Sequence, residues 1–136
     1  MKGKVAIVPC SGIGKSYGSV AREGAYAVTE DLCPETTRLL PLALLVLGDG
    51  EARSMLAERE AITIDGCKLA CAAKVASESG GTVAHKLQVL DVFRRHRDLK
   101  PSGIAELDEN GKKLARILAE EIRELVEGMK GETKRA

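Results

Sequence analysis

The chain has 136 residues and a formal net charge of +1; 44% of its residues are hydrophobic and 30% are charged. This length suits one domain with its own core, and this composition excludes intrinsic disorder. The balanced charge excludes a general attraction to nucleic acid or to membrane surfaces. With two tyrosines, one phenylalanine and no tryptophan, the chain lacks the rings of a stacking platform for single-stranded nucleic acid. No apolar run is long enough for a signal peptide or a membrane span, so we expect a cytoplasmic protein.

The first third of the chain opens with a short apolar run at residues 4–9, which predicts a buried strand. Ser16 ends a Gly- and Ser-rich turn, and we expect it to cap a helix over residues 17–32. A second short strand is expected at residues 36–40. Residues 42–47 fit either a continued strand or one helical turn.

The middle of the chain repeats this alternation. Residues 51–59 predict a short helix, and residues 61–65 are rich in β-branched side chains and predict a third strand. A helix over residues 67–79 is closed by Gly80-Gly81. Residues 82–89 predict a fourth strand. Strands that alternate with helices predict an α/β fold of three layers, with a mostly parallel four-stranded sheet flanked by helices.

The last third of the chain is different in composition. Apolar residues at helical spacing predict a long amphipathic helix over residues 109–129. We therefore expect an α/β domain over residues 1–92 and a C-terminal helical extension, residues 93–136, packed on the sheet of the same domain. A contact between two copies of the chain through this helix, giving a homo-oligomer, is the less favoured use.

Four cysteines stand out, and the predicted topology divides them. Cys10 follows the first strand, and Cys67 follows the third by two residues. The ends of parallel strands share one edge of the sheet, where α/β proteins place their sites. Cys67 and Cys71 are four residues apart, which puts both sulfurs on one face of the predicted helix. Cys10, Cys67 and Cys71 are therefore the predicted metal ligands, with zinc as the preferred metal and iron–sulfur as a rarer occupant.

The fourth cysteine is not expected in this site. Cys33 follows the first helix, which runs back to the opposite edge of the sheet. Asp49, Asp65, a water molecule or a ligand from another chain are the candidates for the fourth metal position. His85 lies on a strand and is expected to be packed, and His96 lies in a basic run and is expected to be solvated.

The loop after the first strand suggests a second kind of ligand. Gly14-Lys15-Ser16 between a strand and a helix resembles part of a phosphate-binding P-loop, but Pro9 stands where that motif needs its first glycine. Binding of a nucleotide or phosphate at the Gly12–Ser16 loop remains an alternative. A milder form is a small anion at the helix start. The binding residues would then be those of this loop: Ser11, Gly12, Gly14 and Lys15.

A third hypothesis is that the protein is a thiol-dependent enzyme or carrier in sulfur transfer or redox chemistry. It needs an exposed cysteine of low pKa. Cys67, at the predicted helix start, is the candidate nucleophile.

Two segments resemble a known family. Residues 10–26 (CSGIGKSYGSVAREGAY) and residues 62–72 (ITIDGCKLACA) are similar to the DGC-domain family, named for the triplet that is Asp65-Gly66-Cys67 here. The resemblance covers residues 4–92 and implies zinc binding through Cys10, Cys67 and Cys71. Three thiolates and Zn²⁺ would carry a net charge of −1, and we expect Lys15 to offset it. The resemblance also implies a further cysteine at the end of the second strand, where this chain has Leu40-Pro41-Leu42. That departure implies a site of three thiolates with an open fourth position.

Overall fold

A computed structural model describes residues 4–10, 15–66, 70–103 and 106–135, with side chains as far as Met129. It contains a four-stranded sheet of order β2-β1-β3-β4 in which every neighbouring pair of strands is parallel. The strands are β1 (Val5–Pro9), β2 (Thr37–Leu39), β3 (Glu60–Asp65) and β4 (Thr82–Gln88).

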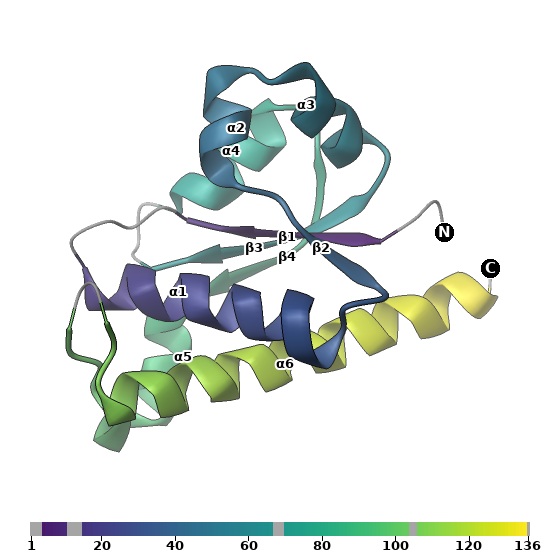
Figure 1. The fold of residues 1–136 in the computed structure, drawn as a ribbon. Coiled ribbons are helices and arrows are strands. Elements are labelled where there is room, and N and C mark those ends of the chain that lie inside the picture. Colours follow the sequence, from purple (N-terminus) through teal and green to yellow (C-terminus); the bar gives the residue numbers. More distant parts are fainter. Residues whose placement is uncertain (1–3, 11–14, 67–69, 104–105, 136) are drawn as a thin grey trace.

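Helices cover both faces of this sheet, which makes the three layers that the sequence predicts (Figure 1). One face carries α2 (Leu42–Leu47), α3 (Gly50–Ala57) and α4 (Cys71–Glu78). The other carries α1 (Ser16–Tyr26) with its π-helical continuation η1 (Ala27–Leu32), then α5 (Val89–Arg95), the 3₁₀ turn η2 (Arg97–Leu99) and α6 (Glu109–Arg135). The α/β fold class is confirmed.

The two central strands explain why their sequences are almost wholly apolar. Every residue of β1 is buried, as are Ala61–Asp65 of β3, because helices cover both faces of the sheet. The edge strand β4 is different: Thr82, Ala84 and Lys86 are exposed, while Val83 and His85 are half-buried. The core therefore lies around β1 and β3.

Local sequence signals set most of the element ends. Residues 42–47, which also fitted a strand, form the helix α2, which ends at Gly48 with φ +77°. Asp49 caps α3 by accepting a hydrogen bond from the N–H of Ala52 at 2.9 Å. Gly80, with φ +89°, closes the segment after α4 as expected.

Two predicted helix starts are wrong. The residue that caps α1 is Lys15, without a side-chain hydrogen bond, and the hydroxyl of Ser16 instead donates to the carbonyl of Gly103 at 2.9 Å. The helix predicted from residue 67 begins at Cys71, because Ala70 has a left-handed backbone with φ +53°. Periodicity does not show such a break, since Ala favours helices.

The C-terminal helix α6 buries its apolar stripe mainly against α1 and η1, and it does not lie directly on the strands as predicted. The reason is that α1 and α5 already occupy that face of the small sheet (Figure 1). Leu114, Leu118 and Ile122 of α6 are fully buried and belong to the same hydrophobic cluster as the strands.

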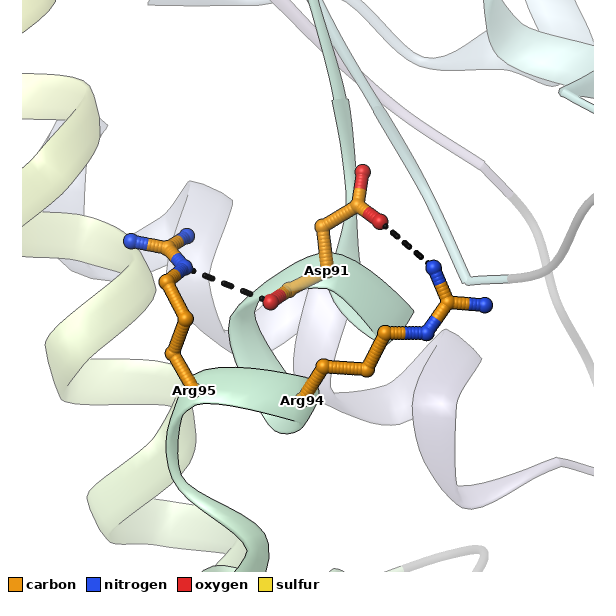
Figure 2. Close-up of polar contacts among 3 residues, drawn as sticks. All are labelled: Asp91, Arg94 and Arg95. Atoms are coloured by element: carbon orange, nitrogen blue, oxygen red, sulfur yellow. Dashed lines mark hydrogen bonds and ion pairs between the residues drawn. The ribbon is translucent and has the colours of Figure 1, made fainter.

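The basic run after β4 forms the last turn of α5 and the segment after it. Figure 2 shows Arg94 paired with the carboxylate of Asp91 at 3.1 Å and Arg95 donating to the carbonyl of Asp91 at 3.3 Å. Arg95 also pairs with Glu121 at 2.9 Å, which links α5 to α6. Of the helices that the structure describes, none combines the length and apolar character needed to cross a membrane.

Candidate functional site

The carboxyl edge of the sheet brings together two segments that are far apart in the sequence. Cys10 directly follows β1, and Gly66 directly follows its neighbour β3. The N–H of Cys10 donates to the carbonyl of Ile64 at 2.8 Å, and the N–H of Gly66 donates to the sulfur of Cys10 at 3.2 Å. The Cys10 side chain is 6% exposed. The expected proximity of these two loops is therefore confirmed.

Asp65 ties the end of β3 to the start of α4. It is only 2% exposed, and its carboxylate accepts hydrogen bonds from the N–H of Ala72 at 2.7 Å and from that of Ala73 at 3.3 Å. Burial raises the pKa of the Asp65 carboxyl above its ordinary value of 3.8, while these two N–H groups and Lys74 oppose the rise. Asp65 thus caps the amino end of α4, although it belongs to β3 and is not the residue that precedes the helix.

Cys71 is the first residue of α4 and is exposed. Its position beside Ala72, which Asp65 holds, places it at the same edge of the sheet as Cys10. However, the α-helix starts after Ala70, so the argument that helical spacing aligns Cys67 with Cys71 does not apply. Cys67 lies outside the described residues.

Gly66 occupies a position that only glycine fits. A Cβ built on it would lie 2.8 Å from the nitrogen of Gly18 and 2.9 Å from the carbonyl carbon of Tyr17. Both atoms belong to the backbone of α1, so neither moves aside easily. The chain after β3 therefore passes directly against the first turn of α1.

Cys33 lies at the opposite edge of the sheet. It ends η1, and its carbonyl accepts a hydrogen bond from the hydroxyl of Thr37, the first residue of β2, at 2.6 Å. Thr37 pairs with Val5 at the start of β1. The five residues of β1 separate this edge from Cys10 by roughly 15 Å.

The two carboxylates proposed as fourth ligands accept hydrogen bonds at the starts of helices. The carboxylate of Asp49 caps α3, and both oxygens of Asp65 accept hydrogen bonds from α4. Within the described residues, no group of three or more His, Cys, Asp or Glu side chains is arranged to hold a metal ion. Ser11, Gly12 and Gly14, predicted to bind an anion, lie like Cys67 outside the described residues.

A pocket of about 470 Å³ opens beside this edge. Only some of the residues that line it were predicted from the sequence. Its walls come from the start of α1, from Gly66, from α5 and from the segment after η2. The lining residues are Lys15, Ser16, Tyr17, Gly66, Leu90, Lys100 and Pro101. Of these, Lys15 was a predicted binding residue. Lys100 was missed because no motif surrounds it; its signal is the Ser16–Gly103 hydrogen bond, which exists only in the folded chain.

The chain matches the model of a known protein family. The DGC domain matches residues 6–127, which extends the resemblance beyond residue 92 and through most of α6. No curated protein and no solved structure matches the chain.

Proposed function

The chain belongs to the DGC domain family, and from this we propose that it is a small zinc-binding protein whose metal is held by Cys10, Cys67 and Cys71 at the carboxyl edge of the sheet. One observation carries the proposal. The N–H of Gly66 lies 3.2 Å from the sulfur of Cys10, so Cys10 touches the residue that directly precedes Cys67. Cys10 is thereby in contact with the residue next to a cysteine that lies 57 positions further along the sequence.

The surroundings suit thiolate ligands. Asp65 accepts hydrogen bonds from the start of α4, and Gly66 lies against the backbone of α1, so contacts hold described residues on both sides of Cys67. Zinc prefers tetrahedral sites built from cysteine sulfur and histidine nitrogen. Three thiolates and Zn²⁺ carry a net charge of −1, which favours a cation nearby, and Lys15 is our candidate for it.

Three protein ligands leave one position of a tetrahedral zinc open. Leu40 and Pro41 stand at the end of β2, where the family resemblance implies a further cysteine, and Leu40 is buried in the core. Asp49 and Asp65 are used as helix caps. We therefore propose that the fourth position is filled by water or by an exogenous ligand, as in exchange or catalytic sites, and not by a fourth cysteine of this chain.

The test is the metal content of the full chain, purified mildly under reducing conditions and measured by elemental analysis. We expect about one equivalent of zinc per chain. Chelation should remove it, and added zinc, but not magnesium, should restore it, because thiolate ligands discriminate strongly between these ions. Less than about a tenth of an equivalent of zinc or iron, with no uptake on reloading, would reject the proposal.

A further inference from the structure

We propose that the pocket between the start of α1 and the segment after η2 binds a small organic oxyanion. Its charged group would lie between Lys15 and Lys100, and its apolar body would lie against Tyr17, Leu90 and Pro101. This goes beyond zinc binding and does not depend on it.

Size and construction support a ligand site. The volume of about 470 Å³ falls in the range of small-molecule pockets. Its walls come from four separated parts of the chain: residues 15–17, Gly66, Leu90 of α5, and Lys100 with Pro101. A pocket of this kind exists only because the fold assembles it.

The charge of the pocket is of one sign. Lys15 and Lys100 both line it, and none of the described residues that line it is acidic. Neither lysine forms an ion pair with any residue that the structure describes. Two ammonium groups at one concave surface attract an anion, and Lys100, unlike Lys15, has no proposed role in the zinc site.

The remaining walls are apolar and held in place. The ring of Tyr17 packs edge-on against Phe93, with ring centroids 5.8 Å apart. Pro101 is buried, and Leu90 is half-buried. These surfaces favour a ligand with an apolar body over a bare inorganic ion.

Hydrogen bonds brace the two sides of the pocket. The hydroxyl of Ser16 donates to the carbonyl of Gly103 at 2.9 Å, which fastens the Lys100 segment to α1. The N–H of Ser102 donates to the carboxylate of Asp108 at 3.1 Å, and that carboxylate also accepts from the N–H of Gly111 in α6 at 2.8 Å. A site braced in this way is formed before its ligand arrives, which lowers the entropic cost of binding.

The experiment measures binding to the purified full chain by calorimetry, with benzoate as the anionic probe and benzamide as its neutral counterpart. Benzoate should bind and benzamide should bind at least about fivefold more weakly, because the lysines recognise charge. Phenyl phosphate is the second probe. If it binds more tightly than benzoate, the ligand class is a phosphate monoester; if benzoate binds more tightly, it is a carboxylate, and both results support an oxyanion site.

Lys100→Gln is the test variant, and Lys113→Gln, on the exposed face of α6, is its matched control. Lys100→Gln should weaken the tighter anionic probe about fivefold or more, while Lys113→Gln should leave its affinity unchanged. Both lysines are exposed, so neither change should alter the melting temperature appreciably. The proposal is overturned if neither anion binds at millimolar concentration, if benzamide matches benzoate, or if the two variants bind alike. The zinc content of the same samples is a separate readout, so failure here leaves the zinc proposal standing.

Discussion

Asp65 and Gly66 occupy adjacent positions after the core of β3, yet they connect it to different helices. The Asp65 carboxylate accepts two N–H groups of α4, and Gly66 lies against the backbone of α1. Between them they orient the chain just before Cys67. We infer that Asp65 and Gly66 of the family triplet fix the path of the backbone, and we propose that Cys67 binds the metal.

Asp65→Ala should lower the free energy of unfolding by about 1–3 kcal/mol, because the buried N–H groups of Ala72 and Ala73 lose their acceptor. Asp65→Asn should cost less. Its amide oxygen can accept the shorter bond, and no charge is buried, whereas burial raises the pKa of the Asp65 carboxyl. Urea unfolding of the three proteins checks this. Equal losses in both variants would show that the hydrogen bonds to α4 are not what Asp65 contributes.

Gly66→Ala should lower stability by about 1–3 kcal/mol, since the new Cβ meets the backbone of Tyr17 and Gly18 at 2.8–2.9 Å. Gly50→Ala is the control, because nothing lies within 4 Å of its Cβ position. That change should stay within about 0.5 kcal/mol. Thermal unfolding of both variants measures the difference, and a Gly66→Ala chain as stable as Gly50→Ala would contradict the close approach of β3 and α1.

At the scale of elements, periodicity and composition were sufficient for the strands but not for every helix boundary. The apolar run of β1 predicted its burial because an inner strand of a parallel sheet meets helices on both faces. The start of α4 could not be predicted, since no local signal marks the left-handed backbone of Ala70 and the hydrogen bonds from Ala72 and Ala73 to Asp65 exist only in the folded chain. The side-chain role of Ser16 was missed for a similar reason: its partner, Gly103, is 87 residues away.

The contact between α1 and α6 depends on a glycine. A Cβ on Gly24 would lie 2.7 Å from Cδ2 of Leu118 and 3.4 Å from the carbonyl oxygen of Ala115. Gly24→Ala should therefore destabilise the chain by about 1–3 kcal/mol, as overpacking does.

Gly128→Ala is the counterpart in α6, with nothing within 4 Å of its Cβ position. It should stabilise the chain by about 0.5–1 kcal/mol through helix propensity alone. Denaturant midpoints of the two variants, with equal m-values, are the measurement. Opposite signs are expected, and two changes of the same sign would refute the packing of α6 on α1.

For the whole molecule, the parallel topology carried most of the predictive power. It placed Cys10 beside the end of β3 and Cys33 at the other edge, because all strands of a parallel sheet run the same way. It did not predict that α6 packs on α1, nor the pocket at Lys100. Both depend on how α6 and the segment before it pack against α1 and α5, which the order of the strands does not determine. The family match through residue 127 agrees with α6 being integral to the fold.

A fragment of residues 1–103, which lacks α6, should not unfold cooperatively. Leu114, Leu118 and Ile122 are fully buried members of the single core, and their loss exposes the apolar face of α1. A fragment that ends at Met129, the last buried residue of the described stripe, is the control and should unfold like the full chain. Circular dichroism during urea unfolding distinguishes the two. A cooperative transition in the shorter fragment would show that the α/β part is an independent domain.

The central claim is that the four cysteines divide into three ligands at the carboxyl edge and one residue outside the site. The most direct measurement is the zinc content of Cys10→Ser beside Cys33→Ser, each purified under identical reducing conditions and each checked for the wild-type far-UV spectrum. Both cysteines are buried, so the far-UV check is needed to separate loss of the fold from loss of the metal. Cys10→Ser should lose its zinc and Cys33→Ser should retain about one equivalent. Retention by Cys10→Ser, or loss from a folded Cys33→Ser, would contradict the account.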